Sequence, residues 1–503
     1  MSERRGGNGG PYIGPQNQHL NTSKVNPMIS CITPTSADRN EFLPLLLRSF
    51  LLQDYPDKEL IVVSEDKIPL PDHPHIRLVH VPRGTTIGNK RNIACANARG
   101  AIIAHFDSDD YSAPHRLTQM AELMQRTRKP VVGYNSVLFH NTIDGGVRYW
   151  HPWDLEWSCG LALVYTKSFW QQFPFQDIQL GEDLTFVQQA KARKAIVTID
   201  GCTSMVALDH SANTDLNRRA TETCILIGEP AQKAISKVFP PMPKVILSIL
   251  TWNTKRISVS AVHALVAEKK RLESIGLNVE IVACDNGSTD GTQKALGKFD
   301  VTCILNEKNM GISVAKNQII DRALERQADF VFFSDGDIEV VPWSILQMMV
   351  WLYKNPTAGC IGPWYDDCTS DHSKMSPHWV KPIQGTTSML WAPCGYGLFP
   401  CRVFEKCRFD HNLGPGWGVE DNDLAAQMCQ ADMKAHFFRD MCFLHTHAHS
   451  AITSLKAAGI DVVLRHKQRV QYLTRKWAHF PEMVAHLNSG GTVPTPEAPI
   501  RKN

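Results

Sequence analysis

The chain has 503 residues, a formal net charge of +3, 43% hydrophobic residues and 20% charged residues. This length predicts two or three domains, the composition is that of a globular protein with a full core, and the near-neutral charge gives no sign of a binder of nucleic acid or another polyanion. The sequence contains no apolar run of about 18 residues and no apolar segment typical of a signal peptide, so we expect no transmembrane helix and a cytoplasmic location. The 14 cysteines form no CxxC pair, which favours reduced thiols in the core.

The sequence repeats one plan twice. Each copy begins with a β-like run, "PMISCITPT" at 27–35 and "KVILSILTWN" at 244–253. A helical pattern, two further short strands, a helix rich in Ala and Asn, and an apolar strand that ends in acids then follow in both copies. This alternation predicts an α/β fold with two tandem, Rossmann-like domains whose central sheets are mostly parallel.

The domain limits follow from this plan. We expect a flexible tail over 1–26, a first domain over 27–227, a linker over 228–243 that ends in a Pro-rich stretch, and a second domain over 244–455. We expect a basic helix and a disordered tail over 456–503.

Acidic side chains stand at the end of the apolar strand in both copies. The first copy has Asp107, Asp109 and Asp110 in "FDSDD", and the second has Asp335 and Asp337 in "SDGD". Carboxylates one residue apart can share a hard divalent cation such as Mg²⁺ or Mn²⁺, and ligands of parallel sheets bind beyond the carboxyl ends of the strands. A strand-end turn rich in Asp is the alternative. The occurrence of the same pattern twice favours the metal.

Both copies resemble glycosyltransferase family 2, the sugar-nucleotide enzymes of GT-A fold. The resemblance covers roughly residues 27–215 and 244–450. Besides the acids, its motifs are "TPT" at 33–35, "TIGNKRN" at 86–92, "LTWN" at 250–253, "CDNGSTDGT" at 284–292 and "NMGISVAKN" at 309–317. Together these motifs imply two tandem GT-A domains that use a nucleotide-sugar donor.

In the second domain, the resemblance implies that Asp285 accepts from the base of a UDP-type nucleotide and that Thr251 and Asn253 line the same pocket. Asn317 lies in the motif next to it. Metal ligands on the diphosphate are implied to include Asp335 and Asp337, and Asp335 also belongs to the donor site. The residues concerned are Thr251, Asn253, Asp285, Asn317, Asp335 and Asp337.

In the first domain, the corresponding donor residues are Thr35, Glu65, Lys90, Arg91 and Asp107. The resemblance implies that the two cations lie near the nucleotide, where they would suit phosphate, although a solvated helix start is an equal alternative. The implied metal ligands are Asp107, Asp109 and Asp110. One departure concerns the base: Ser64 stands where the family has an Asp, so the first donor could differ from the second.

A Glu-Asp pair precedes a predicted helix in each half: Glu182 and Asp183, then Glu420 and Asp421. Acids are favoured at helix starts by the helix dipole, which is the plain explanation. The functional explanation is that the aspartate accepts a proton from the acceptor hydroxyl while the glutamate holds acceptor hydroxyls. The segment "GPGWGVEDND" resembles the acceptor-site segment of galactosyl- and N-acetylgalactosaminyltransferases, which implies that Trp417 stacks on a sugar.

Histidines follow these pairs at similar distances: His210 in the first half, and His445, His447 and His449 in the second. Strand alternation puts the last three on one face, which could complete a metal site. A member of the family often supplies one His to the ion. The sequence does not show whether His445 or His447 is the metal ligand. For His210, the alternative to a metal ligand is a surface or core histidine.

The resemblance therefore implies a metal-dependent, inverting glycosyltransferase that moves sugars from nucleotide-sugar donors to a carbohydrate or other hydroxyl acceptor in glycan or glycoconjugate synthesis. The alternatives are one active module beside one degenerate binding or scaffold module, and a viral enzyme that modifies DNA. Nucleotidyl transfer is disfavoured because neither first strand is followed by a Gly-rich basic loop. The basic helix at 462–476 could contact a membrane surface or nucleic acid, but a solvated face is the commoner explanation.

Overall fold

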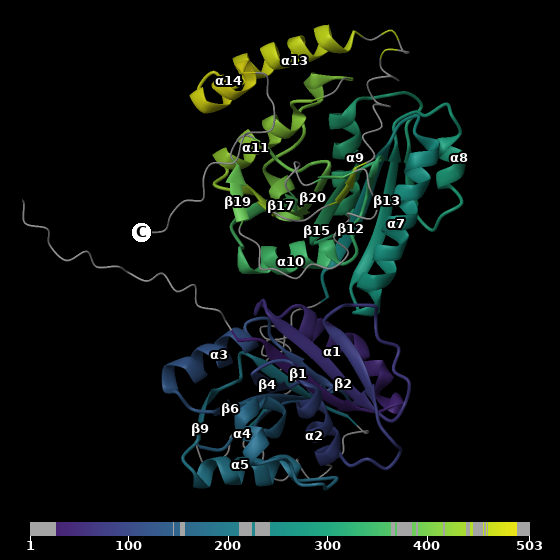
Figure 1. Ribbon diagram of the computed structural model, residues 1–503. Coiled ribbons are helices and arrows are strands. Elements are labelled where there is room, and N and C mark those ends of the chain that lie inside the picture. Colours follow the sequence, from purple (N-terminus) through teal and green to yellow (C-terminus); the bar gives the residue numbers. More distant parts are fainter. Residues whose placement is uncertain are drawn as a thin grey trace, which may run out of the picture.

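A computed structural model shows two α/β lobes, the first drawn in purple and blue and the second in teal to yellow (Figure 1). The structure describes residues 27–143, 145–150, 156–210, 224–226, 242–363, 368–369, 385–388, 391–415, 418–438, 443–445, 456, 459 and 461–489. Within these ranges, no helix has the length and apolar character needed to cross a membrane. The predicted tail, and all but two residues of the predicted linker, lie outside the described residues.

The first lobe is built on one twisted sheet in which β1 lies between β4 and β2. Along the sheet the strands follow the order β11-β7-β6-β8-β4-β1-β2-β3, with β5, β9 and β10 attached at the side. Strands β3, β2, β1 and β4 are parallel, whereas β8 is antiparallel to β4. The strands are β1 (Ile29–Thr35), β2 (Lys58–Ser64), β3 (Ile76–His80), β4 (Ile102–His105), β5 (Asp110–Ser112), β6 (Val131–Asn141), β7 (Val147–Trp150), β8 (Val164–Thr166), β9 (Ile196–Asp200), β10 (Met205–Asp209) and β11 (Cys224–Leu226).

Helices connect these strands, and two short 3-10 helices stand close to the carboxyl edge of the sheet. They are η1 (Ala37–Phe42), α1 (Leu43–Leu51), α2 (Ile87–Asn97), α3 (Arg116–Thr127), η2 (Gly160–Ala162), α4 (Lys167–Gln172) and α5 (Glu182–Ala192). Strand β1 is buried on both sides, which explains why its sequence, ISCITPT, contains no charged residue.

The second lobe repeats this sheet. Its strand order is β14-β13-β12-β15-β20-β17-β21-β19, and a separate small sheet has the order β16-β22-β18. The strands are β12 (Lys244–Thr251), β13 (Asn278–Asp285), β14 (Thr302–Leu305), β15 (Phe330–Asp335), β16 (Ile338–Glu339), β17 (Ala358–Pro363), β18 (Cys368–Thr369), β19 (Gly385–Ser388), β20 (Tyr396–Pro400), β21 (Lys434–Phe438) and β22 (Phe443–His445). The helices are α7 (Lys255–Ser274), α8 (Thr292–Leu296), α9 (Ile312–Glu325), α10 (Ser344–Lys354), α11 (Glu420–Gln430), α13 (Val462–Lys476) and α14 (Pro481–Asn488).

The five strands β3-β2-β1-β4-β8 correspond one by one to β14-β13-β12-β15-β20. In both series the first four strands are parallel and the fifth is antiparallel to the fourth. This agreement confirms the predicted fold class: two tandem α/β domains with mostly parallel central sheets.

The two lobes touch along α1 and α10. The indole Nε1 of Trp343 donates to the carbonyl oxygen of Asp72 over 3.0 Å, and the rings of Trp343 and His73 lie 5.4 Å apart. Buried apolar side chains such as Phe50 in the first lobe and Met349 in the second belong to one continuous cluster. The lobes are therefore joined by an apolar contact as well as by the chain.

Strand register brings the predicted site residues to one edge of each sheet. Thr35 lies beside Ser64 at the ends of β1 and β2. In the second lobe, Thr251 lies beside Asp285, and Leu250 beside Asp335. Both sites are thus built where the parallel strands end.

Candidate active sites

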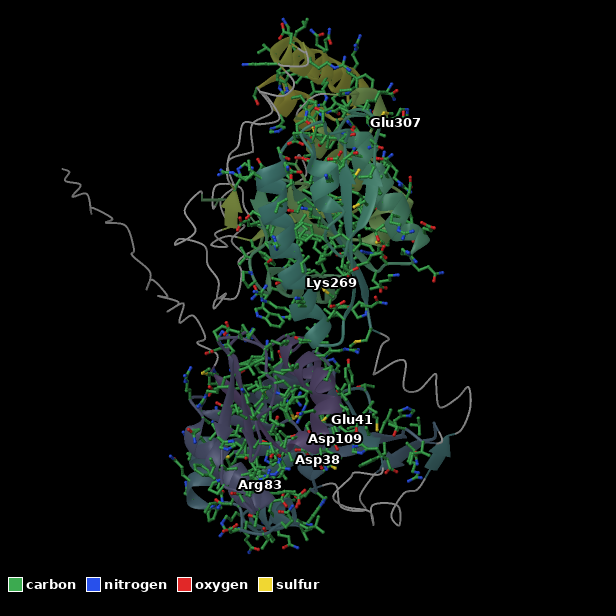
Figure 2. The ribbon with its side chains drawn as sticks, turned by 90° about the vertical axis from the view of Figure 1, so that its right-hand side faces the viewer. Asp38, Glu41, Arg83, Asp109, Lys269 and Glu307 are labelled. Carbon is green, nitrogen blue, oxygen red and sulfur yellow. The ribbon has the colours of Figure 1, made fainter. Side chains whose placement is uncertain are left out.

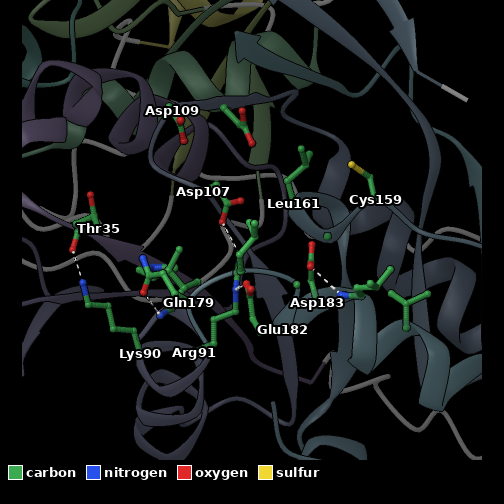
Figure 3. A pocket seen from close by; sticks show the side chains of 18 of the residues that line it. Thr35, Lys90, Arg91, Asp107, Asp109, Cys159, Leu161, Gln179, Glu182 and Asp183 are labelled. Atoms are coloured by element: carbon green, nitrogen blue, oxygen red, sulfur yellow. Dashed lines mark hydrogen bonds and ion pairs between the residues drawn. The ribbon is translucent and has the colours of Figure 1, made fainter. Parts of the chain in front are cut away.

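A cavity of about 670 Å³ opens at this edge of the first domain (Figure 3). Its walls come from the end of β1, the start of α2, the turn after β4, η2 and the start of α5. The residues predicted from sequence that line it are Thr35, Lys90, Arg91, Asp107, Asp109, Asp110, Glu182 and Asp183. Folding thus gathers side chains from four separate segments into one pocket.

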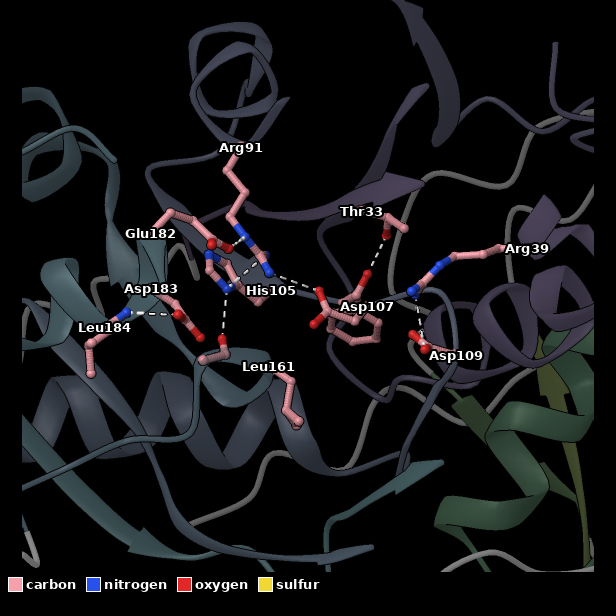
Figure 4. A network of polar contacts seen from close by, with 12 residues as sticks. Thr33, Arg39, Arg91, His105, Asp107, Asp109, Leu161, Glu182, Asp183 and Leu184 are labelled. Atoms are coloured by element: carbon pink, nitrogen blue, oxygen red, sulfur yellow. Dashed lines mark hydrogen bonds and ion pairs between the residues drawn. The ribbon is translucent and has the colours of Figure 1, made fainter. Parts of the chain in front are cut away.

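Arg91 links the two acidic groups of this cavity (Figure 4). Its Nη2 lies 3.2 Å from Asp107 Oδ1, and its Nε lies 3.0 Å from Glu182 Oε1. Burial raises the pKa of the Glu182 carboxyl, and the charge of Arg91 opposes that shift. Arg91 is itself buried, so it forms part of the cavity wall and not a solvated helix start.

His105 lies behind Arg91. Its Nδ1 is 2.9 Å from Arg91 Nη1 and 2.7 Å from the carbonyl oxygen of Gly160, and its Nε2 is 3.1 Å from the hydroxyl of Tyr165. Burial, and then the charge of Arg91, hold the pKa of His105 well below its ordinary value, so the ring is neutral. Sequence reasoning missed this residue because it sits inside the apolar β4 run.

Asp183 stands at the first turn of α5, where the helix dipole favours an anion. Its Oδ1 accepts from the backbone N–H of Leu184 over 2.7 Å. A Cβ at Gly160 would come within 1.5 Å of Asp183 Oδ2, so this close approach requires glycine. The aspartate is therefore held on the cavity wall from two sides.

The candidate metal ligand Asp109 is bound by two side chains. Its Oδ2 lies 3.0 Å from His210 Nε2 and 3.0 Å from Arg39 Nη1. Arg39 comes from η1, and Figure 2 labels Asp109 near Asp38 and Glu41 of the same short helix. Sequence reasoning missed Arg39, which has no local signal because its contact lies 70 residues away.

The third acid of the first triplet has a different setting. The Oδ1 of Asp110 accepts from the backbone N–H of Leu208 over 3.3 Å, across the antiparallel pair of β5 and β10. Asp110 also lines the cavity. The pairing of these strands brings His210, which directly follows β10, to Asp109.

Lys90 and Glu65 face each other near the ends of β1 and β2. Lys90 Nζ lies 3.3 Å from Glu65 Oε1 and donates to the carbonyl oxygen of Thr35 over 3.4 Å. Ser64 Oγ accepts from the backbone N–H of Asp66 over 3.0 Å. In the first domain, an ion pair and a serine turn thus stabilise the ends of β1 and β2.

The corresponding corner of the second domain is organised by Asp285, which is fully buried. Its carboxylate accepts from Thr251 Oγ1 over 2.9 Å, from Ser288 Oγ over 2.6 Å and from Gln293 Nε2 over 2.8 Å. Asn253 Oδ1 accepts from the backbone N–H of Thr289 over 2.8 Å. The predicted residues Thr251, Asn253 and Asp285 therefore form one rigid turn at the end of the strands.

The side-chain amide of Asn317 is hydrogen-bonded to the backbone of Phe409. Its Nδ2 donates to the carbonyl oxygen of Phe409 over 2.8 Å, and its Oδ1 accepts from the backbone N–H of Phe409 over 3.1 Å. Both ends of the amide are thus used to fix a neighbouring loop. The predicted role of Asn317 in the donor site stays a prediction.

The acids after β15 lie beside a buried lysine. Lys316 Nζ is 3.8 Å from Asp335 Oδ1 and donates to the carbonyl oxygen of Cys394 over 2.9 Å. The Asp335 side chain is 45% exposed, so it can still receive a ligand. By its position in the motif, Lys316 corresponds to Arg91 of the first domain.

Asp337 lies 3.6 Å from His445, with Oδ2 facing Nε2. Burial, and then the charge of Asp335, raise the pKa of Asp337 to about 7. The register of β16 with β22 pairs Ile338 with His445, which explains the contact. His447 and Trp417 lie outside the described residues, so their predicted roles stay predictions.

The second Glu-Asp pair begins α11. Val419, directly before it, has a left-handed backbone with φ 68°, an uncommon conformation for a β-branched residue that marks strain at this point. Burial, and then the neighbouring charge of Glu420, raise the pKa of Asp421 to about 7, while Lys316 opposes the shift. Asp421 Oδ1 is buried and has no hydrogen-bond partner among the described residues.

Glu420 Oε2 lies 3.1 Å from Nη2 of Arg469, a residue of α13 that sequence reasoning did not connect with the site.

The donor sets suit a divalent cation in chemical type, since each offers carboxylates and one imidazole. Within the described ranges, no three His, Cys, Asp or Glu side chains are grouped closely enough to hold a metal ion. Arginines neutralise Asp107 and Asp109 in the first domain. In the second domain, the distances to Lys316 and His445 are longer. The carboxylates of the second set are therefore less closely paired with cations of the chain than those of the first.

Comparison with known proteins agrees with this repeated architecture. The family model described as "Glycosyl transferase family 2" matches residues 30–184 and again residues 251–406, together more than half of the chain. An uncharacterized glycosyltransferase of Acanthamoeba polyphaga mimivirus is 30% identical over 97 residues, which cover 18% of this chain and 37% of that protein. The chain thus matches little more than a third of the length of this curated relative.

Solved structures resemble the chain at lower identity. S. aureus TarS 1-349 in complex with UDP is 18% identical over 36% of this chain and 60% of that chain, with a TM-score of 0.30. The mannosyltransferase PcManGT from Pyrobaculum calidifontis, in complex with GDP-Man and Mn²⁺, is 15% identical over 50% of this chain and 70% of that chain, with a TM-score of 0.33. The two family-model matches fall one on each sheet. The chain therefore belongs to glycosyl transferase family 2, and it carries the family's module twice.

Proposed function

We propose that the protein is a metal-dependent, inverting glycosyltransferase in which each domain transfers a sugar from a UDP-sugar to a hydroxyl group of a carbohydrate acceptor. The observation that carries this proposal is the repeated arrangement of strand-end acids and a helix-start Glu-Asp pair. In the first domain both groups line the same cavity, which is large enough for a nucleotide sugar.

The end of the sheet is the donor side. In the second domain, the saturated carboxylate of Asp285 gives the turn at 285–292 a fixed shape against which a base can be recognised. In the first domain, Lys90 and Glu65 occupy this corner. The difference supports different donors for the two domains.

Next to the base lies the diphosphate region. Mg²⁺ or Mn²⁺, when bound, would offset the charge that develops on the departing diphosphate. The residues that would hold it are Asp107, Asp109 and His210 in the first domain and Asp335, Asp337 and His445 in the second. Arg91 and Lys316 lie beside these carboxylates and supply fixed positive charge.

The acceptor side is formed by the Glu-Asp pairs. Asp183 and Asp421 would take the proton from the attacking hydroxyl, and Glu182 and Glu420 would bind further hydroxyls of the acceptor. A base works best when its pKa lies near the working pH, and the raised pKa of about 7 at Asp421 meets this condition. A single displacement by this hydroxyl inverts the anomeric carbon.

The test is turnover of UDP-glucose, UDP-galactose, UDP-N-acetylglucosamine and UDP-N-acetylgalactosamine by the full chain in the presence of Mn²⁺. Release of UDP is followed for the wild type and for the variants Asp109→Ala and Asp337→Ala. We expect one donor or two to be turned over and each variant to lose one activity. Full activity in both variants would show that the metal assignment is wrong.

A second candidate is one active module beside a binding module. The ion pairs of Arg39 and Arg91 with the first acids, and Ser64 at the base position, favour the first domain as the binding module. Calorimetry of UDP with Mn²⁺ on Asp109→Ala and Asp337→Ala separates the two cases. Turnover that survives Asp109→Ala unchanged would support this candidate.

A further inference from the structure

Helices α13 and α14 follow the part of the chain that the family model matches, which ends at residue 406. Figure 1 shows them as the yellow layer beyond α11. Their apolar face is buried in one cluster, to which α11 and its preceding loop also contribute. The cluster contains Leu413, Val419, Ala426, Leu473, Trp477, Met483 and Leu487. The helices are therefore packed onto the second domain.

Polar contacts fix the rotation of α13. Lys476 Nζ lies 2.8 Å from both Asp410 Oδ2 and Asp423 Oδ1. The indole Nε1 of Trp477 donates to Asp423 Oδ1 over 2.8 Å, and the hydroxyl of Tyr472 donates to Asp410 Oδ2 over 2.8 Å. This rotation turns one further cation, Arg469, towards the start of α11.

Arg469 is only 3% exposed. Its Nη2 reaches Glu420 Oε2 over 3.1 Å, while its Nε and Nη1 are buried and have no hydrogen-bond partner among the described residues. A buried guanidinium with unused donors is unfavourable for stability, and an apolar residue would pack here at lower cost. Stability alone therefore does not explain a charged residue at this position, and we look for its role in function.

The first domain supplies that reason by comparison. There, Arg91 reaches both Glu182 and Asp107. Its counterpart Lys316 reaches Asp335 and a backbone carbonyl, and no contact of Lys316 with Glu420 is present in the described part of the chain. In the second domain, the ion-pair partner of the buried Glu420 is therefore Arg469 and not the residue that corresponds to Arg91.

We propose that α13 completes the second active site and that Arg469 is the positioning residue that holds Glu420 towards the acceptor, as Arg91 holds Glu182 in the first domain. This inference rests on the proposed function, because that function gives Glu420 the task of binding acceptor hydroxyls. Without the guanidinium, Glu420 would turn away from the acceptor. The donor corner at Asp285 would be unaffected, since it lies on other strands.

The test uses the full chain with the first domain silenced by Asp183→Asn. In this background we compare Arg469→Met and Arg469→Lys with the control Arg475→Met, whose side chain is exposed on the same helix. The readouts are UDP release from the four UDP-sugars, calorimetric binding of UDP with Mn²⁺, and thermal melting.

We expect Arg469→Met to lower kcat about 10- to 100-fold with an unchanged KM for the donor, because only an interaction made during the reaction is removed. We expect Arg469→Lys to recover part of this loss. UDP binding and the melting temperature of Arg469→Lys should match those of the control.

Equal turnover of Arg469→Met and Arg475→Met would overturn the role of Arg469. A loss of turnover with a matching loss of UDP binding would likewise overturn it. Absence of turnover in the silenced background with Arg469 intact would instead overturn the proposed function of the second domain, and the inference with it.

Discussion

The two domains share a strand order but hold their buried glutamates in different ways. In the first domain, Arg91 of α2 forms ion pairs with both Glu182 and the strand-end acid Asp107. In the second domain, Lys316 serves the strand-end acid, while Glu420 is bound by Arg469 from outside the repeated module. The backbone plan of a repeat can thus be kept while the charges that support its site come from different parts of the chain.

A second difference lies at the donor corner. Asp285 accepts from three side chains and one backbone N–H. Ser64, at the same register position, carries no charge, and its neighbour Glu65 pairs with Lys90. The corner is thus shaped by a saturated aspartate in one domain and by an ion pair in the other, so selectivity for the donor should differ between the domains.

The wall behind the acids also differs. His105 stands one residue before the end of its apolar run, and the corresponding residue of the second domain is Phe333. His105 contacts Arg91 and Gly160, whereas Phe333 packs against the rings of Phe399 and Phe409. The first site is therefore backed by a polar network and the second by an aromatic cluster.

Removal of each proposed base should give the largest effect. We expect Asp183→Asn and Asp421→Asn each to lower the turnover of its own domain about 10²- to 10⁴-fold, because an amide cannot take the proton of the attacking hydroxyl. The measurement is product formation with each donor that the chain turns over. The control Asp300→Asn changes a side chain that is 97% exposed and should have no effect. Unchanged turnover in either variant would remove that residue from the mechanism.

Removal of Arg91 should give the largest effect on stability. Arg91→Met leaves two carboxylates without their shared cation, one of them buried, and the expected loss in the free energy of unfolding is about 3 kcal/mol. Arg91→Lys should lose less, because one of the two contacts can be kept. Urea unfolding of the full chain measures both. Arg83→Met is the control, since that side chain is 87% exposed. If Arg91→Met were as stable as this control, the ion pairs of Arg91 would not contribute to the free energy of unfolding.

Sequence reasoning predicted most of this architecture because its signals are local. Apolar runs that end in acids, and the Glu-Asp pairs ahead of a helix, are visible within about ten residues of the chain. The contacts of Arg39 with Asp109 and of Arg469 with Glu420 were missed, since each joins segments with 49 to 70 residues between them and neither arginine lies in a motif. The hydrogen bonds of Asn317 with the backbone of Phe409 were missed for the same reason, because they join positions 92 residues apart.

The second domain should also show a distinct dependence of stability on pH. Since Asp421 has a pKa of about 7 in the folded chain and an ordinary value of 3.8, the folded state binds this proton more tightly than the unfolded state. Ionisation of Asp421 therefore costs stability as pH rises from about 4 to 7.

The variant Asp421→Asn removes this cost. Each unit of pKa shift corresponds to about 1.4 kcal/mol, and we expect a net gain of about 2 kcal/mol above pH 7 after the cost of burying the amide. Melting curves at pH 5 and pH 8 measure it: the variant should gain several degrees over the wild type at pH 8 and less at pH 5. Asp300→Asn should show no such difference. An equal gain at both pH values would show that Asp421 is not the group responsible.

The smallest expected effect concerns the ion pair that sets the first metal site apart from the second. Arg39→Gln removes the cation that lies 3.0 Å from Asp109 and should leave this carboxylate more available to a divalent ion. Because partly exposed ion pairs contribute up to about 1 kcal/mol, we expect Mn²⁺ to bind the first domain about two- to fivefold more tightly. Calorimetry of Mn²⁺ in the Asp337→Ala background isolates that domain, and Arg83→Gln is the matched control. A weaker or unchanged affinity would mean that Arg39 does not compete with the ion, so that the contrast between the two acidic sites would have to come from Arg91 instead.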